Sequence, residues 1–459
     1  MNRARGRVIA VAALAAFLCL SGGTGGAEER SGEAAKTVVE NPGARKASDG
    51  EAVQKGDVLT LERCIGIALK QQPEILASRN TVDVNRSRVG QAESNYYPQV
   101  ELSAGVNRNS SSSRSFSEGS SSGSSGGSTD YTASATLRQN IYDFGKTSTQ
   151  VRIQKWNTDA SLMDLKSVTD RIVFGVSQAY FGVLQAKRNR DVAEEVVGQF
   201  RQHLEQAQGF FDVGVKPRFD VTKAEVDLSN ARLSLIRAEN SLQLAWVSLK
   251  NAMGVPDAPE FALSDTLSYL RYDVSLSAAV ERAYRNRPDL QASRTRVQAA
   301  EDSVALARKG YYPSLSGDAQ YSRSGERSFD GGWSVGASLT FPLFSGFATR
   351  YQVEEAQASL KVLKANEESV RQTVLLEIQQ TYLNLKEAED RIATAELTVR
   401  QARENLAIAN GRYEAGVGNP IEVTDALVSY STAQTTYTNA LFDYKVSRAN
   451  LEKAMGGKQ

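Results

Sequence analysis

The protein has 459 residues, of which 54 are lysine or arginine, 53 are aspartate or glutamate, one is histidine and two are cysteine. This near-neutral balance argues against a nucleic-acid-binding surface, which needs a basic excess to neutralise phosphates. One histidine and two cysteines are too few to favour a zinc site or a histidine-based catalytic centre. Aromatic residues make up only 8% of the chain and prolines number only 10, a composition that favours long helices over an aromatic-rich β-sandwich.

The N-terminal residues 1–27 have the pattern of a secretory signal peptide. A basic start precedes the apolar run Val8–Leu20, and small residues follow up to Ala27, as before a cleavage site. The run is too short to span a membrane as a helix. A bulky leucine directly before Cys19 fits a lipoprotein cleavage box poorly, so we do not expect lipidation. Residues 28–57 are poor in large apolar side chains and predict a disordered periplasmic leader.

An internal repeat organises the remaining sequence. Short motifs recur in the same order: Gln72-Pro73-Glu74 with Arg287-Pro288-Asp289, and Ala252-Met253-Gly254 with Ala454-Met455-Gly456. A repeat of this length indicates a duplicated domain rather than a short-period solenoid. We therefore predict two structural repeats, residues 58–256 and 274–456, joined by a linker at 257–273.

Both repeats contain a pair of short segments in which apolar and polar residues alternate. They predict β-hairpins at 99–141 and 314–344, around a serine-rich loop at 110–128 and a shorter polar loop at 323–331. Alternation over about 9–11 residues is typical of a tilted transmembrane strand, although a soluble two-sided sheet produces the same pattern. Aromatic residues at the strand ends are placed to form two interfacial belts.

The four predicted strands are too few for a membrane barrel made by one chain, because such a barrel closes with at least about eight strands. An open strand edge in lipid leaves backbone groups without hydrogen bonds. A membrane-inserted chain therefore has to oligomerise. Three chains would supply about twelve strands, and a closed ring is the natural symmetry.

Each repeat also contains a long helical hairpin, at residues 146–254 and 347–455. Lys146–Phe211 contains no proline and keeps a helical period, which predicts a helix of about 100 Å. A glycine turn, at Gly214 or Gly416, ends each outgoing helix. The first returning helix alternates large and small residues in a seven-residue repeat: Leu228, Ala231, Leu235, Ala238, Leu242, Ala245, Leu249 and Ala252. This spacing favours coiled-coil packing. A free-standing coiled-coil rod is the alternative, but a rod has no use for the strands.

The chain resembles the TolC family of outer-membrane efflux proteins of Gram-negative bacteria in the order and spacing of three features. These are the duplicated unit, the strand entries Tyr97-Pro98 and Tyr312-Pro313, and the turn Arg412–Val417. The resemblance implies a homotrimer of α plus membrane-β fold. Its outer-membrane β-barrel has about twelve strands, four from each chain, and a long periplasmic α-helical coiled-coil barrel continues it.

The resemblance also implies a transport function. The protein would be the exit duct of a tripartite efflux or type I secretion system, located in the outer membrane with a large periplasmic portion. Its partners would be a periplasmic adaptor (membrane fusion) protein, an inner-membrane pump and outer-membrane lipid, and it would have neither enzymatic activity nor a cofactor. A passive porin and a trimeric coiled-coil surface protein are the alternatives. A porin, however, does not need helices of about 100 Å, and a one-way stalk does not need returning helices.

The resemblance places candidate gate residues in the second helical hairpin. Glu422 and Asp425 match two positions where the family places acidic rings at the periplasmic constriction. Threefold repetition would bring about six carboxylates around one axis, where they attract cations and resist anions. Charge patterning alone is equally consistent with ordinary surface acids on a solvated turn.

Two further sets of positions follow from the resemblance. Asp220 and Tyr413 match residues whose polar links between neighbouring hairpins hold the tip closed. A family arginine in the second turn is replaced by Gly418, and Lys216 or Arg218 of the other turn are candidate substitutes. The turns match the contact sites of adaptor hairpins: Val213, Gly214, Val215, Ala415, Gly416 and Val417. Glycine there also has a simpler role as a helix stop.

Two isolated residues need separate interpretations. Cys64 lies on the apolar side of a helical pattern and is expected to be a small buried residue. His203 lies among Gln199, Gln202 and Gln206 and has no second metal ligand nearby, so we expect a solvated surface residue.

Overall fold

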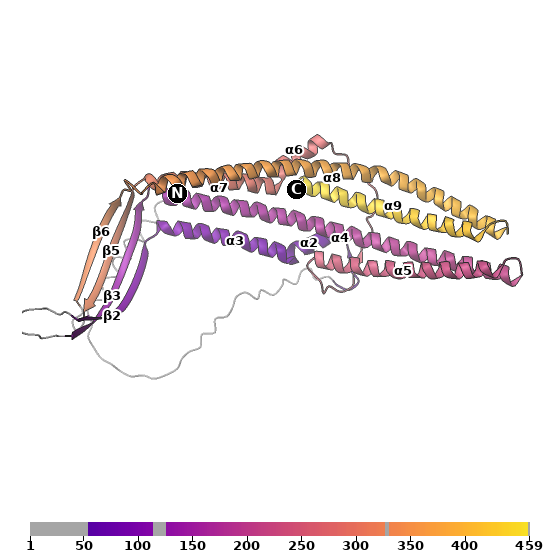
Figure 1. Cartoon of the computed structure of the whole chain (residues 1–459), viewed down its shortest axis with the longest axis horizontal. Helices are drawn as coiled ribbons and strands as arrows, with labels where there is room; N and C mark the ends of the chain where they lie inside the picture. The colour runs from indigo at the N-terminus through magenta and orange to yellow at the C-terminus, as the bar shows by residue number, and fades with distance from the viewer. Residues whose placement is uncertain (1–53, 113–124, 326–329, 458–459) are drawn as a thin grey trace, which may run out of the picture. The chain divides into compact units, whose positions relative to one another are not determined.

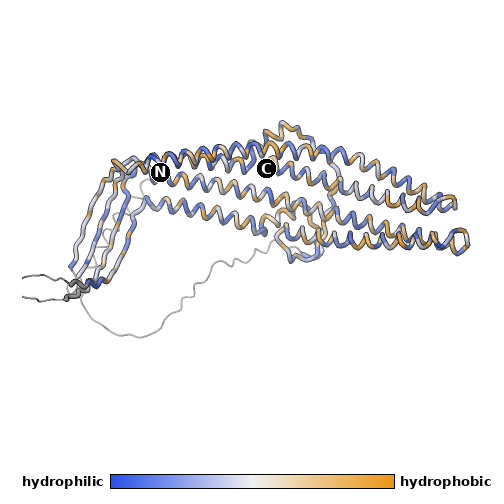
Figure 2. The backbone as a smooth tube through the Cα atoms, viewed as in Figure 1, coloured by the Kyte–Doolittle hydropathy of each residue, from blue (hydrophilic) through white to orange (hydrophobic). Residues whose placement is uncertain are grey.

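The structure, a computed structural model, describes residues 54–112, 125–325 and 330–457. The predicted signal peptide, Cys19 and most of the predicted leader lie outside these residues, as does much of the serine-rich loop. Among the described residues, no helix is long and apolar enough to cross a membrane. Figure 2 shows polar and apolar residues alternating along the long helices.

The same series of elements occurs twice along the chain (Figure 1). The first half contains α2 (Leu61–Gln71), α3 (Pro73–Glu93), β2 (Gln99–Ser112), β3 (Ser125–Tyr142), α4 (Lys146–Asp212) and α5 (Arg218–Ala252). The second half contains α6 (Leu276–Asn286), α7 (Pro288–Arg308), β5 (Ser314–Gly325), β6 (Asp330–Thr340), α8 (Ala348–Glu414) and α9 (Pro420–Ala454). The helices α4 and α8 are each 67 residues long, and α5 and α9 are each 35. The short strands β1 (Val58–Leu59) and β4 (Ala262–Leu263) pair in parallel.

Local sequence signals explain where several helices begin. The hydroxyls of Thr60 and Ser275 accept hydrogen bonds from backbone N–H groups in the first turns of α2 and α6, at 3.4 and 3.3 Å. Pro73 and Pro288 occupy the first positions of α3 and α7, where the missing N–H of proline costs nothing.

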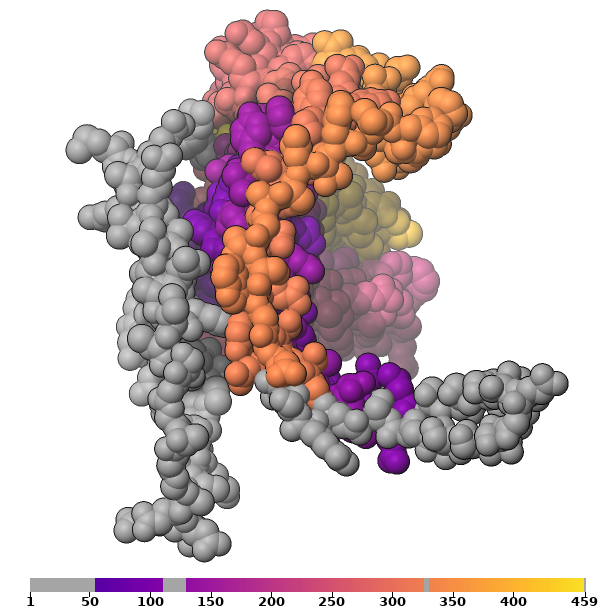
Figure 3. All heavy atoms as spheres, turned by 90° about the vertical axis from the view of Figure 1, so that its left-hand side faces the viewer, coloured from indigo at the N-terminus to yellow at the C-terminus, as the bar shows by residue number. Residues whose placement is uncertain are grey.

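The four longer strands form one antiparallel sheet in the order β2-β3-β5-β6. The register places Leu102 opposite Ala135, which in turn lies opposite Tyr321, and Tyr321 lies opposite Trp333. Because side chains alternate between the faces of a strand, this row and its neighbours form one apolar face. The other face is polar: Ser103 and Ser134, for example, join their hydroxyls at 2.7 Å across β2 and β3. Figure 3 views the sheet from its β6 side, with β5 and β6 in orange in front of the strands of the first half.

The helices follow the same lateral order as the strands. On the sheet side, α4 packs against α3 and α7, and α7 packs against α8. Further from the sheet, α4 packs against α5 and α9, and α9 packs against α8. Figure 1 accordingly shows α3 and α5 at one border of the group and α8 at the other. The largest apolar core joins the two halves around the middle of the long helices, with Tyr180, Leu249, Ile378 and Leu451 fully or almost fully buried.

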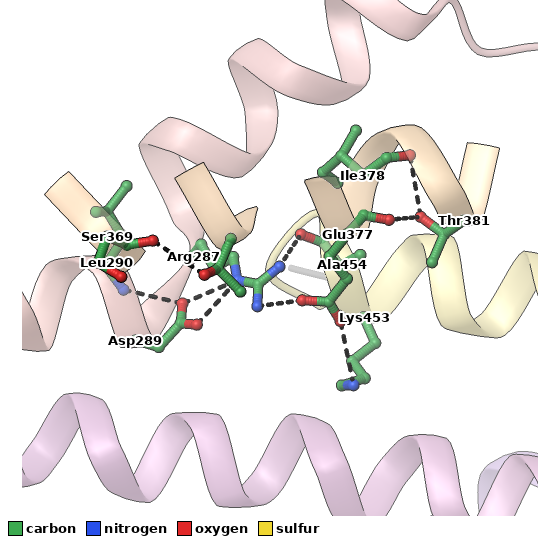
Figure 4. Close-up of polar contacts among 10 residues, drawn as sticks. Arg287, Asp289, Leu290, Ser369, Glu377, Ile378, Thr381, Lys453 and Ala454 are labelled. Carbon is green, nitrogen blue, oxygen red and sulfur yellow. Dashed lines mark hydrogen bonds and ion pairs between the residues drawn. The ribbon is translucent and has the colours of Figure 1, made fainter. Parts of the chain in front are cut away.

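The returning helices α5 and α9 end in equivalent, tightly packed glycine turns. Gly254 and Gly456 have φ values of 73° and 94°. A Cβ atom on Gly254 would lie 3.0 Å from the backbone of the α2–α3 junction, and one on Gly456 would lie 2.8 Å from the backbone of the α6–α7 junction. In the second half, the Arg287 side chain reinforces the junction by contacting the Ala454 carbonyl, Asp289 and Glu377 (Figure 4).

Candidate functional site

Glycine turns build the tips of both long hairpins. Gly214 and Gly416 have φ values of 76° and 77°, a backbone conformation that glycine adopts without strain. The backbone N–H groups of Val215 and Val417 donate to carbonyls in the preceding helices at 2.9 and 3.1 Å, which satisfies groups that a helix end leaves unpaired. The apolar side chains at the turns project into solvent, with exposed fractions of 73% for Val213, 60% for Val215 and 69% for Val417.

The second turn leaves no room for a side chain at residue 418. A Cβ atom on Gly418 would lie 2.7 Å from the backbone nitrogen of Tyr413 and 2.9 Å from the carbonyl carbon of Arg412. An arginine at this position is therefore incompatible with the observed backbone. Lys216 of the first turn supplies a positive charge near residue 418. Its Nζ donates to the Gly418 carbonyl oxygen at 3.4 Å and lies 5.8 Å from the centre of the Tyr413 ring.

The two candidate gate acids lie on the first turns of α9. Both are exposed, but their surroundings differ. The Glu422 carboxylate accepts a hydrogen bond from Arg412 Nε at 3.3 Å. Asp425 has no ion-pair partner among the described residues. Within one chain, Asp425 is therefore the carboxylate whose charge is not offset by a neighbouring guanidinium.

Tyr413 is fully buried between the two hairpins. Its ring lies 5.6 Å from the ring of Phe210 and 4.9 Å from that of His203, measured between centroids. Its hydroxyl has no hydrogen-bond partner among the described residues. Burial raises the pKa of the Tyr413 hydroxyl, and the nearby Asp220 carboxylate raises it further. Asp220 is itself buried, so the structure brings these two predicted residues into one cluster without a direct bond between them.

His203 corrects the sequence-based expectation. We expected a solvated residue, but only 3% of His203 is exposed. Gln202 is exposed and Gln199 and Gln206 are half-buried, whereas Phe200 and Ala207 are buried with His203. The spacing of Phe200, His203 and Ala207 places them on one helix face, but Gln199 and Gln206 have the same spacing from His203, so packing against the second hairpin decides its burial.

Polar contacts join the first hairpin to the second near the tips. The Asp227 carboxylate, on α5, accepts hydrogen bonds from Lys223 at 2.6 Å and from the Thr424 hydroxyl of α9 at 3.0 Å. Gln206 of α4 donates to Glu414 of α8 at 3.2 Å. The sequence did not predict the Thr424–Asp227 and Gln206–Glu414 contacts, because they depend on the register between helices far apart in the chain. In the described ranges, no group of three or more histidine, cysteine or acidic residues is arranged to hold a metal ion.

Comparison with known proteins places the chain in a family. Residues 64–255 and 279–457 match the outer membrane efflux protein family, one match in each half. The chain belongs to the outer membrane efflux protein family. This is a family of outer-membrane channels rather than of catalysts, and the protein is accordingly located in the outer membrane of a Gram-negative bacterium, with a large periplasmic portion.

Three similar proteins illustrate the match. The chain is 24% identical over 404 residues to the outer membrane protein TolC of Vibrio cholerae, covering 85% of this chain and 89% of that protein. It is 27% identical over 449 residues to the protein CyaE of Bordetella pertussis, covering 94% and 91%. The solved structure of the outer membrane protein VceC of Vibrio cholerae has the same fold, with a TM-score of 0.71 at 20% identity, covering 86% of this chain and 96% of that one. The resemblance to the TolC family is therefore confirmed, as is the predicted class of function, an outer-membrane efflux protein.

Proposed function

We propose that this chain works as a homotrimer that forms the exit duct of a tripartite efflux or type I secretion system. Four strands from each chain close a twelve-stranded barrel in the outer membrane, and the long hairpins continue it as a helical tube in the periplasm. A periplasmic adaptor and an inner-membrane pump deliver the substrate to the hairpin tips. The observation that carries this proposal is the arrangement of the free borders of the chain.

The free borders of the sheet and of the helices coincide. The outer strands of the sheet are β2 and β6. The helix before β2 is α3, the helix after β6 is α8, and these helices lie at opposite borders of the helical layer (Figure 1). One border of the chain is thus made of β2, α3 and α5, and the other of β6 and α8. A contact between two different borders repeats head to tail from copy to copy, and it closes into a ring where the rotations between neighbouring copies add up to a full turn.

The border helices also carry the exposed apolar side chains that such a contact needs. On α5, large apolar residues with exposed fractions between 46% and 64% recur along the helix: Phe219, Val226, Leu233, Ile236, Leu244 and Val247. On α8 the corresponding fractions lie between 45% and 65%, at Tyr351, Val362, Leu376, Leu383, Leu397 and Ile408. On the central helices α4, α7 and α9, by contrast, the exposed large apolar residues are only Phe211, Ile421 and Val428. Extended apolar surface on a folded chain marks a place for a partner, here the opposite border of a second copy.

The apolar face of the sheet supports a place in lipid. Leu102, Val106, Trp333, Val335 and Leu339 are between 64% and 78% exposed, although they belong to one continuous face. A water-facing sheet would normally bury such a face against other elements. Contact with lipid acyl chains supplies the missing cover, and pairing of β6 with β2 of the next copy removes the open edges.

The tips are the proposed gate and docking region. Asp425 and Glu422 line the constriction, with Asp425 carrying more of the electrostatic effect because Arg412 offsets Glu422. Tyr413 and Asp220 contribute to tip closure by packing the hairpins together. The exposed valines of the two glycine turns contact the adaptor. A passive porin or a trimeric surface stalk remains a competing function, but neither explains apolar borders on two long antiparallel hairpins.

A border substitution tests the ring. Ile236 of α5 is 62% exposed, so a carboxylate there costs a single chain little but is unfavourable against an apolar partner border. We expect Ile236→Glu to lower the fraction of trimer in native mass spectrometry of the detergent-solubilised protein. Ser241→Glu, at an exposed position on another face of α5 beside the groove with α4 and α9, is the control. Equal trimer fractions in both variants would contradict the proposed interface.

Proteolysis of intact cells separates the duct from a surface stalk. A duct exposes only the segments that join β2 to β3 and β5 to β6. Added protease should therefore cut there and leave α4, α5, α8 and α9 intact. Cleavage within the long helices on intact cells would favour the stalk.

A further inference from the structure

We propose that His203 makes the packing of the two hairpin tips sensitive to pH, because protonation of its imidazole favours separation of the hairpins. The neutral imidazole favours the packed arrangement. The effect on conduction rests on the exit duct proposed above, but the titration of His203 and its effect on helix packing do not. The proposal starts from the fact that His203 is the sole histidine of the whole chain.

The geometry places His203 at the contact between the hairpins. It lies on α4, and its ring lies 4.9 Å from that of Tyr413 on α8. Both residues are almost completely enclosed, with exposed fractions of 3% and 0%. Neighbouring apolar residues of both hairpins form one cluster, which includes Phe200, Leu406 and Val423. An ion formed on His203 therefore arises inside the packed interface rather than at its rim.

The described surroundings of His203 lack a hydrogen-bond acceptor at Nδ1 that would stabilise a positively charged imidazolium. Its Nδ1 is buried and has no hydrogen-bond partner among the described residues, and the same holds for the Tyr413 hydroxyl. A neutral imidazole tolerates such a site at a moderate cost. An imidazolium has two N–H donors and a full charge, so leaving it without partners or water costs more.

The charged groups around His203 come from several elements and partly cancel. Asp220 and Asp227 of α5 are negative, and Lys223 of the same helix is positive and forms a 2.6 Å ion pair with Asp227. Tyr413 of α8 is neutral near pH 7, because burial raises the pKa of its hydroxyl. From α9, the Thr424 hydroxyl donates to Asp227, and Lys216 of the first turn lies over the Tyr413 ring. Asp227 is the carboxylate that would best offset the charge of an imidazolium on His203, but it already accepts hydrogen bonds from Lys223 and Thr424.

The direction of the pH effect follows from these surroundings. Burial lowers the pKa of His203 below its ordinary value of 6.5, and this outweighs Asp227 and Asp220, which act to raise it. A histidine with a lowered pKa in the packed state stabilises that state fully above the ordinary value. The stabilisation decreases as the pH falls through 6.5 towards the lowered pKa. Acid therefore favours separated hairpins, in which the imidazole reaches water.

A direct titration tests the first step. Because the chain has one histidine, protein labelled with 15N-histidine gives the signals of a single imidazole. In the full-length protein in detergent micelles, we expect this imidazole to titrate with a midpoint below 6.5. A midpoint at or above 6.5 would overturn the proposal, since the packed state would then favour the proton. This measurement is independent of whether the protein conducts.

Hydrogen exchange tests the second step. At pH 5.5, peptides covering residues 197–210 and 406–414 should exchange faster in the wild type than in His203→Phe, which retains an aromatic ring but cannot titrate. At pH 7.5 the two proteins should differ much less. Because the pKa of His203 is lowered in the packed state, the ratio of packed to separated hairpins falls as the imidazole becomes protonated. Comparing proteins at the same pH removes the intrinsic pH dependence of exchange.

A second variant distinguishes titration from packing. His203→Gln is polar but does not titrate, so we expect it to loosen the same peptides equally at both pH values. If His203→Phe or His203→Gln keeps the wild-type increase in exchange at pH 5.5, another group is responsible and the proposal is wrong. If exchange responds as expected but single-channel conductance in planar bilayers does not, the pH-sensitive packing stands and the proposed duct gate is the part that fails.

Discussion

Gln72 and Arg287 occupy equivalent places in the two halves of the chain, and each caps the end of a returning helix. Gln72 Nε2 donates to the Ala252 carbonyl at 3.1 Å, and Arg287 Nη1 donates to the Ala454 carbonyl at 3.4 Å. Both side chains thereby satisfy a carbonyl that the helix end leaves unpaired. The two halves of the chain therefore share the same contact between a side chain and the end of the returning helix, made by glutamine in the first half and by arginine in the second.

The contact made by Arg287 should stabilise the second half more than the contact made by Gln72 stabilises the first half. Arg287 also forms ion pairs with Asp289 and Glu377, and only 12% of its side chain is exposed. We expect Arg287→Gln, which copies the first half, to lower the free energy of unfolding by about 2–4 kcal/mol, because it leaves part-buried carboxylates without their main partner. Thermal unfolding in detergent measures the change.

Arg285→Gln is the control, because it removes the ion pair between Arg285 and Glu281, whose side chains are both 70% exposed. It should lower the free energy of unfolding by less than about 0.5 kcal/mol. Equal effects would show that the buried network adds no stability.

The glycine turn at the end of α9 should not accept a side chain. Gly456 has a φ of 94°, and an added Cβ would lie 2.8 Å from the backbone of Asn286. Gly456→Ala is therefore expected to lower the free energy of unfolding by more than about 1 kcal/mol. Gly66→Ala serves as the control, since Gly66 lies inside α2 with open space around a Cβ and alanine favours a helix by up to about 1 kcal/mol. The two variants should change the melting temperature in opposite directions, and a shared direction would contradict the steric argument.

The second hairpin turn provides a similar test at the tip. The backbone nitrogen of Tyr413 lies 2.7 Å from where a Cβ of residue 418 would be, so Gly418→Ala should force the turn open. We expect faster hydrogen exchange in residues 406–414 in this variant than in the wild type. Gly411 lies in the last turns of α8, and a Cβ there would have nothing within 4 Å, so Gly411→Ala should leave exchange unchanged or slower. Unchanged exchange in Gly418→Ala would mean that the turn relaxes without disturbing the packed tip.

The two gate acids should contribute unequally to cation block. Asp425 lacks an ion-pair partner in the described ranges, whereas Glu422 lies 3.3 Å from Arg412. In planar bilayers, we expect Asp425→Ala to weaken block of the single-channel current by divalent cations more than Glu422→Ala, and the double variant to weaken it most. Glu404→Ala, an exposed acid on α8 away from the turn, is the control. If the double variant is blocked like the wild type, these residues do not form the gate.

Several properties were readable from local sequence. Cys64 was expected to be buried from its place in a helical pattern, and it is fully buried in α2, so that prediction is confirmed. The expectation of a solvated His203 is wrong, because its burial depends on packing against Tyr413 of the second hairpin and not on its neighbours in the sequence. Gly418 occupies a position where the family resemblance places an arginine. In the structure, the backbone of this turn leaves no room for any side chain at residue 418.

The sequence by itself determined the elements and their duplication: strands where apolar and polar residues alternate, long helices where the helical period continues without proline, and turns at glycine. These signals reside in consecutive residues, and the backbone preferences behind them act over a few residues. Only the tertiary structure decided that α5 and α8 lie at opposite borders and that His203 and Tyr413 share one enclosed cluster. It also decided that Arg412 pairs with Glu422, whereas Asp425 has no ion-pair partner among the described residues. Such contacts depend on the register between packed helices, and that register is set by the fit of many side chains at once rather than by any one segment.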